Sequence, residues 1–193
     1  MIRRLQDIQG FLRDILKPYI HSGDIVLDLT AGRGRDTLFL AENVGEEGQV
    51  HAFDVQEIAL EETRKLLREK GLEQRVHLYA LDHARVLEKV HAPVQVAMFN
   101  LGYLPGHNHE ITTQAFSTIS ALKAVLELLS TGGVIALTVY RGHDGGNQEA
   151  LAVEEFLRAL PRRIFSVLRG EYSNQGENTP YWILVQKNKG DIG

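Results

Sequence analysis

The chain has 193 residues, 44% of them hydrophobic, which allows a full buried core and fits a single domain, 1–193, better than two. Its formal net charge of −4 gives no overall basic field that would indicate nucleic acid, and the absence of cysteine excludes disulfides, thiolate zinc sites, iron–sulfur clusters and a cysteine nucleophile. No apolar run approaches the roughly 20 residues that span a bilayer, and the N-terminus lacks the apolar core of a secretory signal, so we expect a cytoplasmic protein with no membrane partner.

Helical and strand patterns alternate along the chain. The predicted elements are, in order, a helix within 1–20, a strand over 24–30, a helix over 36–44, a strand over 49–54, a helix over 56–70, strands over 75–80 and 94–100, a helix from about 112 to 129, a strand over 134–140, a helix from about 147 to 160, strands over 163–169 and 181–187, and a flexible tail over 188–193. Thr112 or Thr113 is the expected cap of the fourth helix and Asn147 that of the fifth.

This alternation predicts an α/β fold with a mostly parallel, doubly wound sheet that is covered on both faces. The last two strands have no helix between them, so we expect them to form an antiparallel hairpin at one edge. Dehydrogenase-type dinucleotide folds usually continue with crossovers, whereas methyltransferase sheets end in such a hairpin.

A glycine loop follows the first strand. Gly32 and Gly34 allow the backbone to turn tightly and to approach a ligand closely. Asp54 ends the second strand about 20 residues later, the spacing expected for an acid that binds ribose hydroxyls. Thr37 stands where the dinucleotide fingerprint has its third glycine, so a cofactor without a pyrophosphate, such as S-adenosylmethionine, suits the loop better than NAD. Asp28 either orients this loop or binds the cofactor's ammonium group.

Several motifs together resemble a bacterial family long labelled as rRNA methylases, whose members are S-adenosylmethionine-dependent tRNA 5-aminomethyl-2-thiouridine methyltransferases. The resemblance runs from about Ile25 to Lys187. The matching motifs are Asp28-x-Thr30-x-Gly32-x-Gly34-x-Asp36-Thr37, Phe53-Asp54-x-Gln56, His83, Phe99-Asn100-Leu101-Gly102-Tyr103-Leu104-Pro105, and Asn174 with Pro180. The family implies a class I methyltransferase (Rossmann-like) fold and methylation of the aminomethyl nitrogen at the tRNA wobble uridine.

The resemblance also implies roles for individual residues. The cofactor would be bound by Asp28, Thr30, Gly32, Gly34, Asp36, Thr37, Asp54, Gln56, Asp82, His83 and Asn100. The substrate, an anticodon stem–loop, would be bound by Leu101, Gly102, Tyr103, Pro105, Arg141 and His143. The catalytic residues would be Asn100, Tyr103 and His83. The chain departs from the family pattern at Leu81-Asp82-His83, at His107-Asn108-His109-Glu110, and at Arg33, Arg35 and Asp144.

The string after the fourth strand resembles the Asn/Asp-Pro-Pro-Tyr motif of amino methyltransferases. In that motif the Asn oxygen and a following carbonyl accept hydrogen bonds from the target nitrogen, so Asn100 and the Leu101 carbonyl would hold an amine here while Tyr103 stacks on the uracil. An alkyl amine is mostly protonated at neutral pH and must lose a proton before it attacks. His83, His107 or His143 could accept that proton.

Structural alternatives remain open for these residues. Asn100 could cap a strand end through an Asx turn. His107-x-His109-Glu110 has no third ligand in evident register, so we expect a solvated loop and no metal. Arg33, Arg35 and Arg141 could form a local patch for RNA phosphates or be scattered surface arginines.

Other functions also remain possible: methylation of rRNA or of a small amine, a non-catalytic S-adenosylmethionine- or RNA-binding module, and, more remotely, an NAD oxidoreductase. A homodimer is possible, although no heptad or apolar stripe supports one.

Overall fold

The computed structural model describes residues 7–102, 112–142, 145–176 and 178–189. Its centre is a seven-stranded sheet with the order β3-β2-β1-β4-β5-β7-β6. The strands are β1 (Ile25–Asp28), β2 (Gln49–Asp54), β3 (Val76–Ala80), β4 (Val94–Leu101), β5 (Leu129–Val139), β6 (Phe165–Gly170) and β7 (Tyr181–Lys187). The first five are parallel, whereas β7 is antiparallel to both β5 and β6. The expected edge hairpin is confirmed.

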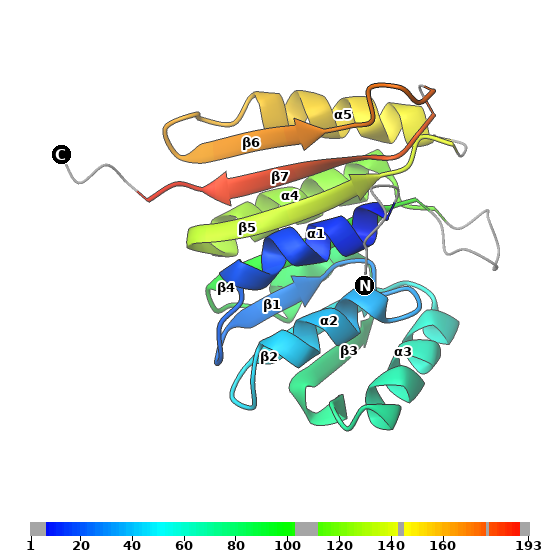
Figure 1. The fold of residues 1–193 in the computed structure, drawn as a ribbon, viewed down its shortest axis with the longest axis vertical. Helices are drawn as coiled ribbons and strands as arrows, with labels where there is room; N and C mark the ends of the chain where they lie inside the picture. The colour runs from blue at the N-terminus through cyan, green and yellow to red at the C-terminus, as the bar shows by residue number, and fades with distance from the viewer. Residues whose placement is uncertain (1–6, 103–111, 143–144, 177, 190–193) are drawn as a thin grey trace.

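Helices cover both faces of this sheet. The α-helices are α1 (Ile8–Leu16), α2 (Arg35–Asn43), α3 (Glu57–Glu69), α4 (Ala115–Leu128) and α5 (Gly146–Arg158), and the 3-10 helices are η1 (Lys17–Tyr19), η2 (Glu73–Arg75) and η3 (His83–Glu88). In Figure 1, α1 and α2 lie in front of the sheet, and α4 and α5 lie behind it. None of the helices in the described ranges has both the length and the apolar character that crossing a membrane requires.

Alternate residues of the central strands face opposite layers. Val96 and Met98 of β4 pack in one cluster with Leu16 and Leu40 from the α1 and α2 side. Ala97 and Phe99, which alternate with these two residues along β4, belong to the other cluster, together with residues of α4 and α5. Because both faces are buried, β1 and β4 are short, nearly continuous apolar runs, which made them recognisable from sequence.

The ends of several elements differ from the sequence-based expectation. Gln114, not Thr112 or Thr113, is the N-cap residue of α4, and it makes no side-chain capping bond. Gly145 precedes α5 with a φ of +79°, so the helix begins before Asn147. The strand β5 begins at Leu129 because Leu129 pairs with Val94 ahead of an irregularity in the ladder. Tertiary pairing therefore overrode the local turn and cap signals.

The N-terminal α-helix, Ile8–Leu16, is shorter than the helix expected over 1–20. Asp7 caps α1 by accepting a hydrogen bond from the Gly10 N–H at 2.9 Å. The α-helix ends at Leu16, and Pro18 lies in the following 3-10 turn, η1. The helix α1 lies across β4 and β5, and its polar side chains can therefore reach the carboxyl ends of these strands.

Candidate active site

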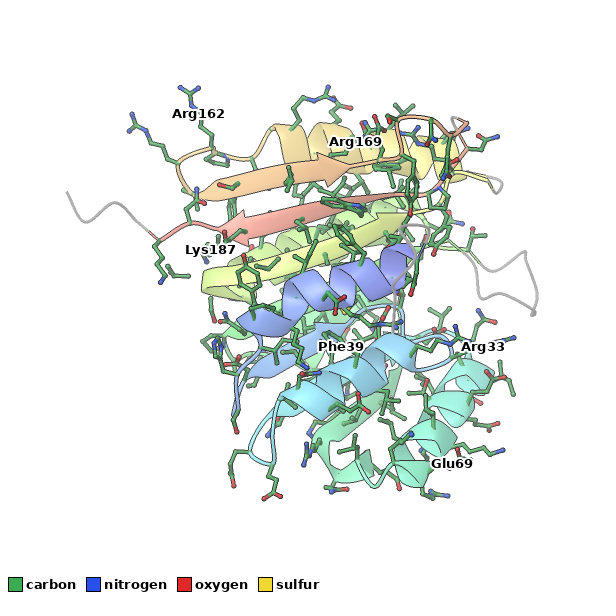
Figure 2. All side chains as sticks on the ribbon, in the orientation of Figure 1. Arg33, Phe39, Glu69, Arg162, Arg169 and Lys187 are labelled. Atoms are coloured by element: carbon green, nitrogen blue, oxygen red, sulfur yellow. The ribbon has the colours of Figure 1, made fainter. Side chains whose placement is uncertain are left out.

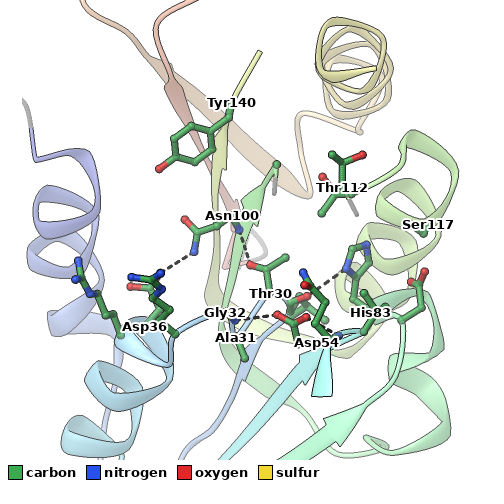
Figure 3. Close-up of a pocket in the computed structure, with 18 of the residues that line it drawn as sticks. Thr30, Ala31, Gly32, Asp36, Asp54, His83, Asn100, Thr112, Ser117 and Tyr140 are labelled. Carbon is green, nitrogen blue, oxygen red and sulfur yellow. Dashed lines mark hydrogen bonds between the residues drawn. The ribbon is translucent and has the colours of Figure 1, made fainter. Parts of the chain in front are cut away.

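A pocket of 460 Å³ opens at the carboxyl ends of β1, β2 and β4 (Figure 3). This is where the strand order reverses, since β1 is followed in the chain by its neighbour β2 on one side and paired with β4 on the other. Among the predicted site residues, the pocket is lined by Thr30, Gly32, Asp36, Asp54, Gln56, Asp82, His83, Asn100 and Gly102. Residues far apart in the sequence therefore meet in one pocket, as expected.

The glycine loop forms the floor of the pocket. Gly32 and Gly34 both have a positive φ, +51° and +74°. A Cβ atom on Gly34 would lie 2.9 Å from the Cα of Thr63, so this position has no room for a side chain. The Thr63 hydroxyl in turn donates to the Gly32 carbonyl at 3.0 Å, which joins the loop to α3. Both glycines are thus required by backbone geometry.

Asp54 is hydrogen-bonded directly to the glycine loop. Its carboxylate accepts the Gly32 N–H at 2.9 Å and the Gln56 N–H at 2.9 Å while it lines the pocket. Burial raises the pKa of Asp54, and the two amide donors oppose that shift. A carboxylate offers about four acceptor positions, so two remain for hydroxyl donors of a ligand. This geometry suits a ribose.

Asp28 lies beneath the loop rather than in the pocket lining. It is fully buried and accepts hydrogen bonds from the Thr30 N–H at 3.2 Å and the Thr37 hydroxyl at 2.6 Å. Burial and, next, the nearby Asp36 carboxylate raise the pKa of Asp28 to about 7. Of the two roles expected for Asp28, the structure places it where it orients the loop. Gly34 and Thr37 likewise stand behind the lining and support it.

Asn100 lies at the opposite end of the pocket from Asp54, as the labelled side chains in Figure 3 show. Its side-chain N–H donates to Asp36 Oδ2 at 2.7 Å, and Asp36 Oδ1 accepts from Arg13 Nε at 2.6 Å. Its backbone N–H donates to the Thr30 hydroxyl at 2.7 Å. The Asn100 side chain thus reaches across to α2 and forms no Asx turn in the described hydrogen bonds, and its Oδ1 points away from Asp36 toward Gln9 of α1.

Among the lining residues that the sequence analysis missed are Gln9 and Arg13. They come from α1, one helical turn apart, so both project from the same polar edge of the helix. Gln9 Nε2 lies within hydrogen-bond distance of three oxygens: Asn100 Oδ1, Thr138 Oγ1 at 3.0 Å and Tyr140 Oη at 3.2 Å. The sequence does show a Gln and an Arg four residues apart beside the apolar stripe of this helix. That pattern predicts a polar helix edge but not what the edge contacts.

The predicted residues Asp82 and His83 close the side of the pocket away from Asn100. Asp82 caps η3 through the Ala84 N–H at 2.8 Å. His83 Nδ1 lies 3.1 Å from the Leu29 carbonyl oxygen, to which it donates, and this leaves Nε2 as the unprotonated nitrogen. Burial lowers the pKa of His83, so the ring is neutral near pH 7.

Beyond His83, a buried carboxylate holds the helix that borders the pocket. Glu149 of α5 is 2% exposed and accepts the hydroxyls of Thr113 and Thr118, each at 2.6 Å. The Thr113 N–H also donates to the Gly102 carbonyl at 2.9 Å. Glu149 therefore fixes the start of α4 against the end of β4.

The remaining predicted residues divide into those that line the pocket, those that lie outside it and those outside the described residues. Leu101 is buried, and its carbonyl already accepts the Tyr140 N–H at 3.1 Å. Arg141 does not line the pocket; it pairs with Glu154 at 3.1 Å and packs over the Tyr181 ring. Arg33 and Arg35 do line the mouth. The predictions for Tyr103, Pro105, His107, Asn108, His109 and His143 fall outside the described residues. Within the described ranges, no group of three or more His, Asp or Glu side chains could hold a metal ion.

A second, basic groove lies at the other end of the sheet. It is lined by Gly132, Arg162, Arg163, Ser166, Gln186, Lys187, Asn188 and Lys189, so it carries four cationic side chains and no acidic one. Figure 2 shows Arg162 and Lys187 at the opposite end of the molecule from Arg33. The Asn188 side chain donates to the Arg162 and Arg163 carbonyls, both at 3.3 Å, and thereby fixes the loop that carries these arginines.

Comparisons with known proteins agree with this geometry. A family model described as "Putative rRNA methylase" matches residues 50–186. The chain is 43% identical over 152 residues to the chloroplastic tRNA (mnm5s2U34)-methyltransferase of Arabidopsis thaliana; the match covers 74% of this chain and 56% of that protein. The chain therefore spans only about half the length of this curated relative.

Two solved structures resemble nearly the whole chain. A protein of Clostridium thermocellum titled a "putative rRNA-methylase" superposes with a TM-score of 0.92 at 39% identity, over 97% of this chain and 99% of that one. A Streptococcus mutans methyltransferase in complex with SAH superposes with a TM-score of 0.86 at 35% identity, with the same two coverages.

Proposed function

The chain belongs to the rRNA methylase family, whose fold is the class I methyltransferase sheet described above, and we propose that it transfers a methyl group from S-adenosylmethionine to an amine nitrogen. The observation that carries this proposal is convergence on one pocket. The glycine loop and Asp54 form one end, and the side-chain amide of Asn100 forms the other. We also propose that residues 1–193 act as one domain.

The cofactor end fits an adenosyl group. Asp54 has acceptor positions left for two ribose hydroxyls, and a hydrogen bond from a hydroxyl to a carboxylate is of the stronger, charge-assisted kind. Leu29 and Val55 provide apolar lining beside this acid. The pocket volume of 460 Å³ lies within the usual range for small-molecule sites. S-adenosylmethionine, when bound there, supplies an electrophilic methyl group on a sulfonium.

The residues of this chain supply positioning. Asn100 Oδ1 accepts an N–H of the amine, which leaves the nitrogen lone pair free to point at the methyl carbon. S-adenosylmethionine held by the glycine loop and Asp54 would supply the methyl carbon, the electron pair of the broken carbon–sulfur bond would return to sulfur, and the methylated ammonium would then release a proton. His83 lines the pocket and its Nε2 is the unprotonated ring nitrogen, so this atom is the candidate acceptor for such a proton.

We infer that the amine belongs to 5-aminomethyl-(2-thio)uridine at the wobble position of a tRNA, and that the product is the 5-methylaminomethyl nucleoside. The Arabidopsis relative, 43% identical, carries this modification in its name. Arg33 and Arg35 at the pocket mouth and the basic groove lined by Arg162 and Arg163 provide cations for RNA phosphates on a chain whose net charge is negative. Methylation of rRNA or of a small amine is the alternative within the same reaction class.

The test is direct. Purified protein is incubated with S-adenosylmethionine and tRNA isolated from cells that lack this gene, and the digested nucleosides are analysed by mass spectrometry. We expect the aminomethyl nucleoside to disappear, a nucleoside about 14 mass units heavier (one added methylene) to appear, and adenosylhomocysteine to be released. Cofactor binding without any methylated product on tRNA, rRNA or small amines would instead identify a non-catalytic binding module.

A further inference from the structure

The acceptor oxygen of Asn100 is already in use. Gln9 Nε2 donates to Asn100 Oδ1, and the same nitrogen lies 3.0 Å from Thr138 Oγ1 and 3.2 Å from Tyr140 Oη. An amide nitrogen has two hydrogens, so it cannot donate to all three oxygens at once. Gln9 therefore stands at the position that the proposed function assigns to the substrate amine.

The other half of the Gln9 amide is unsatisfied. Its Oε1 atom is buried and has no hydrogen-bond partner among the described residues. Buried polar atoms are nearly always paired, and an orphaned acceptor costs free energy. The observed arrangement thus leaves a buried acceptor of a pocket-lining residue without a donor.

Rotating the Gln9 amide by about 180° would give Oε1 hydrogen-bond donors. Oε1 would then face the hydroxyls of Thr138 and Tyr140, both of which can donate. It would also face Asn100 Oδ1, and two acceptors would oppose each other. Asn100 cannot relieve the conflict by turning as well, because its Nδ2 is held by Asp36 Oδ2 at 2.7 Å and a turned amide would place an oxygen against that carboxylate.

A donor between the two oxygens resolves the conflict. We propose that Gln9 is an amine-binding residue, which releases Asn100 when substrate enters, turns its amide, and accepts one N–H of the substrate nitrogen while Asn100 accepts the other. This inference rests on the proposed function. A neutral primary amine has two N–H groups and one lone pair, so two carbonyl acceptors use both hydrogens and leave the lone pair for the methyl carbon. A hydroxyl has one hydrogen and satisfies only one of the two oxygens, so the pair selects amines over alcohols.

The nature of the two acceptors also favours the reactive form of the amine. Amide oxygens carry only partial charge, so they hold a neutral amine without strongly stabilising its ammonium form. A carboxylate at the same place would stabilise the ammonium and raise its pKa. The variant Gln9→Glu therefore has a signature that a purely structural role of Gln9 does not produce.

The experiment compares Gln9→Leu, Gln9→Glu and a control variant, Phe11→Leu, which changes the same helix at a side chain that is 39% exposed and packs on Trp182. For each, kcat and KM are measured on tRNA carrying the aminomethyl nucleoside between pH 6 and 9, and adenosylhomocysteine binding is measured by calorimetry. Gln9→Leu should lower kcat/KM about 10- to 100-fold, while the Kd of adenosylhomocysteine stays within about twofold. Gln9→Glu should shift the alkaline rise of the rate to higher pH. Phe11→Leu should match the wild type in both respects.

Two outcomes would overturn the inference separately from the proposed function. If the wild type methylates the amine and Gln9→Leu stays within twofold of it, Gln9 does not bind the amine. The same holds if Gln9→Glu is active with an unmoved pH profile. If the wild type methylates no amine at all, the proposed function fails and the role of Gln9 fails with it.

Discussion

Asn100 and Asp36 are joined by a side-chain hydrogen bond of 2.7 Å, although they lie 64 residues apart in the sequence. The same carboxylate holds Arg13 at 2.6 Å. An amide has two similar ends, and without a partner it could present either one. Asp36 accepts the N–H end, so the oxygen of Asn100 is the end that faces the substrate space.

Replacing Asn100 with alanine should lower amine methylation about 100-fold or more, since it removes the group that positions the nitrogen. The Kd of adenosylhomocysteine should change less than about threefold, because Asp54 and the glycine loop stay intact. Single-turnover methylation and calorimetry measure the two quantities. Asn43→Ala is the control, since that amide donates to the Phe39 carbonyl within α2 at 2.6 Å. Normal turnover in Asn100→Ala would remove this residue from the mechanism.

Alanine at Gly34 should destabilise the fold through two separable effects. Gly34 and Gly71 both have a positive φ, +74° and +68°, but only Gly34 has Thr63 within contact of an added Cβ. We expect Gly71→Ala to cost about 1 kcal/mol for the backbone conformation alone. Gly34→Ala should cost about 1–3 kcal/mol more, because the loop or α3 must move. Urea unfolding measures both, and equal losses would show that contact with Thr63 is unimportant.

Asp28 should make stability depend on pH. Its pKa is raised from 3.8 to about 7 in the folded state, so between these values the folded chain retains a proton that the unfolded chain has lost. Stability from this group is therefore complete below about pH 4 and declines as the pH rises to 7, by at most about 1.4 kcal/mol per pH unit. Asp28→Asn keeps a neutral side chain of the same shape. Between about pH 4 and 7 the free energy of unfolding of Asp28→Asn should therefore rise relative to that of the wild type, as measured by urea unfolding at successive pH values. If the two plots of unfolding free energy against pH run parallel, the pKa of Asp28 is not raised.

Reversing charge in the basic groove should weaken RNA binding without affecting the cofactor. For Arg162→Glu with Arg163→Glu, we expect the Kd for tRNA to rise at least about tenfold and the slope of log K against log salt to fall by about 1–2. Fluorescence anisotropy across a salt series measures both. The exposed pair Arg64 and Lys65 on α3, changed in the same way, is the control. If both double variants weaken binding equally, the groove is no specific RNA contact.

Much of the fold could be predicted because the strands are short runs of Val, Ile and Leu bounded by turn residues. The bounds expected for the second and seventh strands, 49–54 and 181–187, match those observed. The glycine loop and Asp54 were found because their chemistry is local in sequence. Helix-cap predictions were wrong where a tertiary partner competed for the capping side chain. Thr112 or Thr113 was expected to cap α4, yet the Thr113 hydroxyl donates to Glu149 instead.

The substrate end of the pocket was harder to predict. Gln9 meets Asn100 across 91 residues, and helical periodicity identifies the buried face of α1 but not what its polar edge contacts. Glu149 was missed for a similar reason. A single acidic residue in a charged helix is normally expected to face solvent, and the two threonine hydroxyls that bind this carboxylate come from another part of the chain. Such contacts depend on how helices from distant parts of the chain cross the sheet.

The two ends of the pocket are encoded by different stretches of the gene. The glycine loop and Asp54 come from the β1–β2 unit, whereas Asn100 comes from β4, and Gln9 and Arg13 come from α1, which precedes the first strand. If Gln9 binds the amine, mutations confined to α1 should alter which nucleophile is accepted while the methyl donor continues to bind.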